Sequence, residues 1–448
     1  MQVVIVGAGN VGYTLARTMS RKYTVMMVEQ DEKRYRRILD SLDIGAVNAN
    51  GGSPAVLKDL LTEKTGLFLA VTEKDEFNIF ACQVAKKLRP EVGTIARVRN
   101  PEYMVGDIQW ESFGVDRTFS PERLTASKMK KLAMVEDLID YERVPGFGLA
   151  VAVFRVTDRH DAGLFKPLKF MEMPPGSSIL VIHRRGELLL PSRTENLQVG
   201  DDVTILGPPG AIKEFNALLG KVHDPHDFVV VGGDIVAEQL LDILKDTKCS
   251  IKLIEKDEAR CKWLSRKFSN AVIINDNGTD PSVLRDENVN MADALICTTD
   301  NEEENLLSCL IGKHLGVTKT ITKFSRRDYE MVFDMSGVDA AIGTYHVVAN
   351  ELVRQTVPDL EVLVLMAGFD EALIGVPIAE KCIYMGCPVS ELQLPDRSVL
   401  GMVIRNERPI PPTSDLILSG GDLLLIYASR RDVPELEHMF KTKIPLGP

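Results

Sequence analysis

The sequence predicts an α/β protein with two doubly wound parallel-sheet domains, each followed by a small α+β domain. Short β-branched runs alternate with amphipathic helices from the first residues onward, a pattern typical of a parallel sheet covered by helices on both faces. The pattern occurs twice in the 448 residues, because MQVVIVGAGNVG at residues 1–12 corresponds to DFVVVGGDIVA at residues 227–237. The predicted domains are residues 1–140, 141–221, 227–354 and 355–448.

The strands and helices of the first domain follow from their residue patterns. Short apolar runs bounded by turn residues predict strands, and apolar residues at helical spacing predict helices. The predicted strands are Val3–Val6, Thr24–Val28, Leu67–Val71 and Thr94–Val98, and the predicted helices are Val11–Met19, Asp31–Leu39 and Asn78–Leu88. The helix predicted to close this domain lies near Pro121–Tyr141, because proline suits a first helical turn.

The small domains contain shorter strand-like runs separated by turn residues. These runs are Ala150–Val156, Ser178–His183, Leu188–Leu190 and Val203–Leu206, and then Val362–Ala367, Val399–Ile404 and Leu423–Tyr427. Pro174-Pro175-Gly176 is a turn signal between two of them. The segment KVHDPHD at residues 221–227 joins the two halves, and we interpret its His223 and His226 as part of a polar linker, not as metal ligands.

Composition and charge exclude several classes of protein. A hydrophobic fraction of 45% is ordinary for a globular chain, and its apolar runs are too short to span a membrane. Residues 1–6 carry no basic region, so we expect no signal peptide. The net charge of −11 argues against nucleic-acid binding, which depends on a basic surface. Seven cysteines without a C-x-x-C motif indicate reduced thiols and no metal site.

The first half carries a dinucleotide-binding pattern of the Rossmann type. Gly7, Gly9 and Gly12 follow a predicted strand and open a helix, and Glu29 lies at the end of the next strand. These glycines allow a tight turn, close approach of a pyrophosphate, and packing of helix against strand. The helix N-terminus then offers free N–H groups to the phosphates. Glu29 is expected to accept hydrogen bonds from ribose hydroxyls and to repel a 2′-phosphate, which favours NAD(H) over NADP(H).

The second half departs from this pattern. Gly232 is retained, but Asp234 and Ala237 replace the second and third glycines. A carboxylate at residue 234 would repel a pyrophosphate and could cap the helix itself. Glu255 persists at the end of the next strand. We therefore expect the second half to bind a dinucleotide weakly or not at all.

The sequence argues against an enzyme. A dehydrogenase needs a proton relay beside the nicotinamide, yet residues 1–140 contain no histidine and no tyrosine has a lysine four positions later. Asp75 and Glu76 have acidic counterparts in the second half, where the glycine loop is altered, so a structural or ligand-gripping role fits them better than hydride chemistry. His160 and His183 fall in the first small domain.

Together, VVIVGAGNVG, the acid Glu29, AVTEKDEFN and TIARVRNPEY resemble the regulator of potassium conductance domain, also called the KTN domain (residues 3–12, 29, 70–78 and 94–103). The small parts resemble its C-terminal companion. The duplicated order over the whole chain is similar to the NAD-binding regulatory subunits of bacterial Trk potassium uptake systems. The resemblance implies a cytoplasmic homo-oligomer, a dimer or a tetramer ring, peripheral to the inner face of the cell membrane. It would gate a channel subunit of the TrkH type without entering the membrane.

The resemblance also implies a set of ligand-binding positions. In the first half these are Gly7, Ala8, Gly9, Asn10, Val11, Gly12, Glu29, Thr72, Glu73 and Arg97. In the second half they are Gly232, Gly233, Asp234, Glu255, Thr299 and Lys323. The expected ligand is NAD(H), with ATP or ADP as alternatives at the same site. A regulator of another cation transporter or antiporter, and a soluble NAD-dependent oxidoreductase, remain alternative functions.

Overall fold

The first parallel-sheet domain, hereafter domain A, is a six-stranded sheet in the order β3-β2-β1-β4-β5-β6 with every pair parallel. Its strands are β1 Gln2–Val6, β2 Thr24–Glu29, β3 Gly45–Asn48, β4 Thr65–Ala70, β5 Gly93–Arg97 and β6 Arg117–Phe119. The helices α1 Asn10–Met19, α2 Glu32–Ser41, α3 Pro54–Leu60 and α4 Asp75–Leu88 cover its faces. The computed structural model describes residues 1–20, 22–104, 108–158, 167–191, 195–219, 224–356, 362–366, 371–380, 382–429 and 431–441.

The second parallel-sheet domain, domain B, repeats this order as β14-β13-β12-β15-β16-β17. Its strands are β12 Asp227–Val231, β13 Ser250–Glu255, β14 Val272–Asn275, β15 Ala294–Cys297, β16 Thr320–Phe324 and β17 Ala340–Gly343. Its helices are α7 Ile235–Leu244, α8 Glu258–Lys267, α9 Pro281–Asp286, α10 Glu302–Leu315 and α11 Glu330–Ser336. The predicted α/β class with two Rossmann-like sheets is therefore confirmed.

Two antiparallel five-stranded sheets form the small domains, and they share one strand order. The first runs β10-β9-β11-β8-β7 and the second β21-β20-β22-β19-β18. The strands are β7 Leu138–Val144, β8 Leu149–Arg155, β9 Ser178–Arg184, β10 Glu187–Leu189 and β11 Asp202–Gly207, then β18 Val362–Leu365, β19 Glu371–Pro377, β20 Val399–Arg405, β21 Arg408–Ile410 and β22 Leu423–Ser429. The helices α6 Pro209–Leu219 and α13 Val433–Lys441 complete them. Val151, Leu180, Met402 and Tyr427 belong to one buried cluster, so the two small sheets pack against each other.

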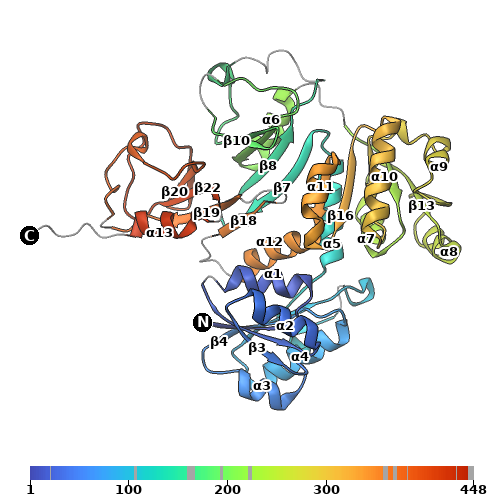
Figure 1. Cartoon of the computed structure of the whole chain (residues 1–448), viewed down its shortest axis with the longest axis horizontal. Coiled ribbons are helices and arrows are strands. Elements are labelled where there is room, and N and C mark those ends of the chain that lie inside the picture. Colours follow the sequence, from blue (N-terminus) through green and yellow to red (C-terminus); the bar gives the residue numbers. More distant parts are fainter. Residues whose placement is uncertain are drawn as a thin grey trace, which may run out of the picture.

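The connecting helices are exchanged between the halves. Helix α5, Pro121–Ala133, leaves domain A but packs on α7 of domain B, and α12, Thr344–Thr356, leaves domain B but packs on α1 of domain A. Ala126 and Met129 of α5 share a buried core with Leu240 of α7, whereas Leu352 of α12 shares one with Leu15 of α1. Figure 1 shows α12 (orange) lying against α1 (dark blue).

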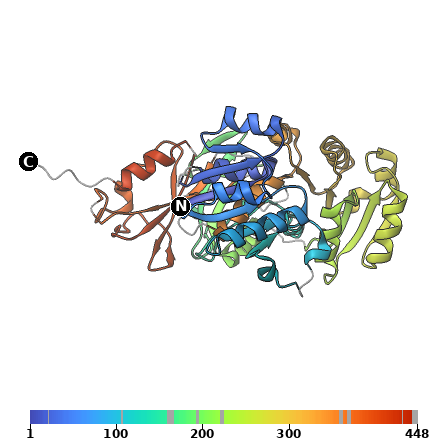
Figure 2. The same cartoon turned by 90° about the horizontal axis from the view of Figure 1, so that it is seen from below.

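The helix predicted near Pro121–Tyr141 is therefore shorter than expected and covers a different domain. Ser120 caps its start by accepting from the Arg123 N–H, and the helix ends at Ala133. The end of the predicted segment is a strand, β7, which pairs with β8 of the small sheet, so residue 140 lies inside that strand. Figure 2 shows domain B (yellow-green) and the last small domain (red) at opposite ends of the molecule.

Candidate functional site

A cavity of roughly 800 Å³ lies between domains A and B, at the carboxyl ends of their parallel strands. Four helices begin at its wall: α1 after Gly9, α5 at Pro121, α7 at Ile235 and α12 at Thr344. In domain A the cavity lies where the strand order reverses between β1 and β4, the usual ligand position in an open α/β sheet. Its size suits a small organic ligand or cofactor.

The glycine loop of domain A has the geometry that a phosphate cradle needs. Gly7 has φ +100°, which favours glycine, and a Cβ on Gly12 would lie 1.9 Å from the Gly7 carbonyl oxygen. A Cβ on Gly9 would meet only Arg34 Nη1, at 4.0 Å, so this residue faces open space in the cavity. Helix α1 has no side-chain cap and no acidic residue in its first turn. Its first N–H groups are therefore available to an anion.

Glu29 is held through both carboxylate oxygens and joins the glycine loop to the start of α2. Oε2 accepts from the Ala8 N–H at 2.6 Å, and Oε1 accepts from the Asp31 N–H at 2.9 Å. The residue is 6% exposed and lines the cavity. Each oxygen keeps a further lone pair, so the carboxylate can also accept from a ribose hydroxyl, as the sequence predicts.

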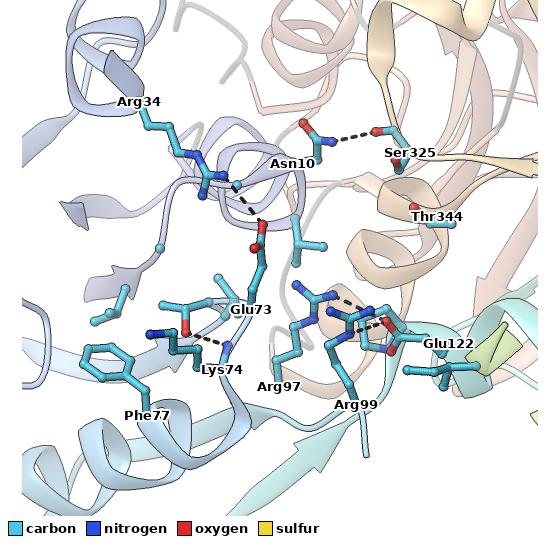
Figure 3. Close-up of a pocket in the computed structure, with 18 of the residues that line it drawn as sticks. Asn10, Arg34, Glu73, Lys74, Phe77, Arg97, Arg99, Glu122, Ser325 and Thr344 are labelled. Atoms are coloured by element: carbon cyan, nitrogen blue, oxygen red, sulfur yellow. Dashed lines mark hydrogen bonds and ion pairs between the residues drawn. The ribbon is translucent and has the colours of Figure 1, made fainter. Parts of the chain in front are cut away.

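Two arginines and one glutamate form the cationic wall of the cavity (Figure 3). Glu122 Oε1 accepts from Arg99 Nε at 2.8 Å and lies 3.5 Å from Arg97 Nη2. The Nε of Arg97 is buried without a hydrogen-bond partner. Burial lowers the pKa of Arg97, and the nearby Glu122 carboxylate only partly offsets this effect. Arg97 is thus a largely buried cation with an unused donor at Nε, as an anion site requires.

Sequence reasoning identified Arg97 but missed Arg99 and Glu122. Arg99 could have been predicted from its spacing. It lies two residues after Arg97 at a strand end, where alternate side chains share a face. Glu122 could not be assigned in this way, since it belongs to α5 and reaches the cavity only through the fold.

Asn78 ties together the two strand ends that carry Thr72 and Arg97. Its Oδ1 accepts from the Thr72 N–H at 2.9 Å and from Thr72 Oγ1 at 2.7 Å, while its Nδ2 donates to the Thr72 and Arg97 carbonyl oxygens. Asp75 accepts from the Arg99 and Asn100 N–H groups. These contacts give AVTEKDEFN a structural role in positioning the site.

The remaining predicted residues of the first half lie around the same cavity. Asn10 reaches across it and donates to the Ser325 carbonyl oxygen of domain B at 2.8 Å, and Glu73 lies 3.6 Å from Arg34 (Figure 3). Thr72 and Val11 also line the wall, whereas Gly12 does not and serves helix packing. Apart from Ala8 and Gly12, the predicted first-half residues thus line one cavity.

In domain B, a carboxylate fills the place that the glycine leaves open in domain A. Asp234 caps α7 by accepting from the Ala237 N–H at 2.9 Å, and its Oδ2 lies 2.7 Å from Lys323 Nζ. Lys323 corresponds to Arg97, so the second half neutralises its own cation. Arg260 further closes this loop, because it donates to the Gly233 carbonyl oxygen and to Glu238.

The other predicted second-half residues hold the loop of domain B in the same conformation as the loop of domain A. They do not form an open binding site there. Glu255 accepts from the Gly233 N–H at 2.6 Å and from the Asp257 N–H at 2.8 Å, as Glu29 does in domain A. Gly232 has φ +97°, and a Cβ there would meet the Thr299 backbone nitrogen at 2.7 Å. Asp234 and Lys323 line the cavity between the domains, whereas the residues that line it do not include Gly232, Glu255 or Thr299.

The structure also places the groups considered for catalysis and metal binding. His183 is buried in β9 of the first small sheet, 3.9 Å from Glu371 of the second, and His160 lies outside the described residues. Among the described residues no cluster of His, Cys, Asp and Glu could hold a metal ion, and all seven cysteines are free thiols. The described helices include none with the length and apolar character needed to cross a membrane.

Comparison with known proteins places this architecture in a family. The model of the TrkA-N domain matches residues 3–121 and 228–344, and that of the TrkA-C domain matches residues 373–441. The chain belongs to the TrkA family. It is 31% identical to the Trk system potassium uptake protein TrkA homolog 2 of Methanosarcina mazei, over 98% of this chain and 100% of that protein. It is 26% identical to TrkA of Haemophilus influenzae, over 98% and 99%.

Solved structures share the fold of this TrkA-family chain. The crystal structure of the GsuK RCK domain matches with a TM-score of 0.60 at 16% identity, over 98% of this chain and 94% of that one. The GsuK channel bound to NAD matches with a TM-score of 0.60 at 16% identity, over 98% and 78%. At this level of identity the likeness establishes the fold of the tandem domains.

Proposed function

We propose that this TrkA-family chain is the nucleotide-sensing regulatory subunit of a Trk-type potassium uptake system. It would act from the cytoplasm as a homo-oligomeric ring on a membrane channel subunit of the TrkH type. Full-length similarity to Trk potassium uptake proteins supports the transport role. One observation carries the sensing role: the uncapped α1 loop faces the unsatisfied Arg97 across a cavity that both halves line.

In this proposal the ligand is NAD(H), with ATP or ADP competing for the same site. The pyrophosphate lies over Gly9 at the start of α1, and Glu29 accepts from the ribose hydroxyls and disfavours a 2′-phosphate. NAD bound to a structural neighbour of the same fold supports this ligand class. The ligand is a signal and not a redox substrate, because no histidine lies among the described residues that line the cavity.

The gating step follows from where the cavity lies. A ligand shifts a conformational equilibrium only through its different affinity for the two states. Because residues of domains A and B line the same space, a bound nucleotide contacts both and favours one relative arrangement. The ring of TrkA-family subunits would pass this change to the channel.

Two experiments test the proposal. Affinity purification of the tagged chain from membranes of its native cells should recover a potassium channel subunit.

In cells that lack their own regulator, the wild-type chain should make potassium uptake responsive to NAD(H) or to adenine nucleotides. A Gly9→Asp variant should lose this response, while a Gly210→Asp variant, which adds the same charge on α6 in open space, should keep it. Unchanged regulation in a Gly9→Asp variant that no longer binds nucleotide would reject the proposal, and turnover of NAD with alcohols or hydroxy acids would indicate an oxidoreductase.

A further inference from the structure

Glu122 occupies an unusual place, because it is a buried carboxylate that joins two halves of the molecule. It lies in the first turn of α5, directly after Pro121, and is 8% exposed. Its Oε1 contacts Arg99 at 2.8 Å and Arg97 at 3.5 Å; Arg97 is the last residue of strand β5 of domain A, and Arg99 follows the strand. Glu122 thus binds the end of the domain A sheet to a helix that packs elsewhere.

Helix α5 is held firmly by domain B. Its apolar residues share a core with β12, β13 and α7. Arg123 donates to Gln239 Oε1 at 2.9 Å, and Lys130 donates to the Ile243 carbonyl oxygen at 3.0 Å. A buried amino group of domain B, Lys319 Nζ, donates to the Leu132 carbonyl oxygen at 2.6 Å. Movement of the first turn of α5 would therefore act on the part of domain B that packs against this helix.

Domain B lacks the corresponding arrangement. Lys323, the counterpart of Arg97, pairs at 2.7 Å with Asp234 from the glycine loop of its own domain. Helix α5 begins at Pro121 and α12 begins at Thr344, so Tyr345 occupies in α12 the second helical position that Glu122 occupies in α5. The Tyr345 hydroxyl donates to Glu330 at 2.9 Å, within domain B. Only in the first half does the carboxylate that faces the cationic wall come from an exchanged helix.

We propose that Glu122 is a displaceable internal ligand of Arg97 and Arg99, whose place the phosphates of a bound nucleotide take. This inference rests on the nucleotide-binding function proposed above. A phosphate and a carboxylate compete for the same guanidinium donors, and arginine binds a phosphate with two parallel hydrogen bonds. The long contact from Arg97 to Glu122 and the unused Arg97 Nε leave these donors ready for a stronger acceptor.

Displacement leaves Glu122 as a buried carboxylate beside a second anion. That arrangement is costly, because a buried charge without its partner loses the attraction that offset its desolvation. The first turn of α5 must then move away from the end of β5, and domain B moves with it. When a ligand fills the cavity, Glu122 thus loses its contacts with Arg97 and Arg99. The loss of these contacts is the step that changes how the two halves are arranged.

The test measures affinity and coupling on the full-length chain. We compare wild type with Glu122→Gln, which keeps the size of the side chain but removes the competing charge. Glu111→Gln is the control, because it removes the same charge from an exposed residue of the same half. Isothermal titration with NAD and with ADP gives the affinity. Hydrogen exchange of peptides from α5 and α7, with and without ligand, gives the coupling.

We expect Glu122→Gln to bind NAD at least about 5-fold more tightly, the lower end of usual coupling between sites. In wild type the ligand should raise the exchange rate at the start of α5. In Glu122→Gln this exchange should be raised before any ligand is added and should change little afterwards. Glu111→Gln should behave as wild type in both measurements.

The contrary outcomes are distinct. Equal or weaker binding by Glu122→Gln shows that Glu122 supports the site and does not compete for it. If Glu122→Gln binds NAD more tightly but its α5 hydrogen exchange still responds to ligand as in wild type, the proposed coupling between Glu122 and the arrangement of the halves is wrong. If Glu122→Gln does not fold, Glu122→Asp decides the question, because its shorter side chain weakens the tie to Arg99 and should still bind more tightly than wild type. Failure of the wild-type chain to bind any nucleotide would instead refute the proposed function itself.

Discussion

Replacement of Gly9 by aspartate should separate nucleotide binding from stability. Gly9 has φ −62°, which any residue adopts, and its Cβ would meet nothing closer than Arg34 Nη1 at 4.0 Å. Domain B shows where the new side chain would lie, since Asp234 at the equivalent position caps α7 and pairs with Lys323. In the Gly9→Asp variant the carboxylate should cap α1 and face Arg97.

The magnitudes follow from these contacts. Exchanging glycine for aspartate at an N-cap stabilises a helix by a few tenths of a kcal/mol, so the melting temperature should not fall. The phosphates would lose hydrogen bonds to the start of α1 and to Arg97. Each hydrogen bond to a charged group contributes about 1.5–3 kcal/mol, and two of them amount to at least about 100-fold in Kd.

Isothermal titration with NAD measures the affinity, and differential scanning fluorimetry measures the melting temperature. Gly210→Asp is the matched control, because its Cβ also meets open space and it adds the same charge at the first turn of a helix. A Gly9→Asp chain that melts normally and binds NAD within tenfold of wild type would show that the phosphates lie elsewhere. A large loss of stability would show that the glycine loop of domain A does not accommodate an aspartate where the loop of domain B accommodates Asp234.

Three further predictions concern the framework around the site. Asn78→Ala and Asn305→Ala should each reduce the unfolding free energy by about 3–4 kcal/mol, from four and three lost hydrogen bonds respectively, but only Asn78→Ala should weaken NAD binding in titration. Arg184→Met should cost about 3 kcal/mol in denaturant unfolding, because it leaves the fully buried Asp201 without the guanidinium that binds both its oxygens at 2.8 Å. Burial lowers the pKa of Lys319 to about 7 against 10.5 for an ordinary lysine, so between these values the unfolded chain binds more protons and stability rises with pH. Relative to Lys319→Met, wild type should gain up to about 1.4 kcal/mol per pH unit above pH 7, and parallel pH profiles of the two proteins would contradict this assignment.

The sequence predicts the sheets well because their central strands are short apolar runs with glycine or polar boundaries. It does not predict the edge strands β3, β6, β14 and β17, which are only three or four residues long and carry little periodic signal. The exchange of α5 and α12 is also invisible in the sequence. An apolar face such as that of Ala126 and Met129 requires a partner, but its spacing does not say which domain supplies it.

The residues of the candidate site also fall into those that the sequence reveals and those that only the fold reveals. Gly7, Gly9 and Glu29 are recognisable because the chemistry of a phosphate loop fixes their spacing. Glu122 is not, because its contact with Arg99 depends on a helix that returns to the cavity after the sheet is complete. The difference between the two loops was predictable from Asp234, whereas its ion pair with Lys323 required the structure.

The exchange of α5 and α12 has a consequence for how such a protein can diverge. A single half would leave the apolar face of its own connecting helix uncovered and would need a second copy to bury it. Two identical copies would carry the same loop twice, and every substitution would appear in both. Joined in one chain, the halves share a core while their loops change separately. The fusion thus allows the loop of domain A to keep Gly9 at the start of α1 while the loop of domain B carries a carboxylate at residue 234, so that the two halves of a symmetric scaffold differ at their loops.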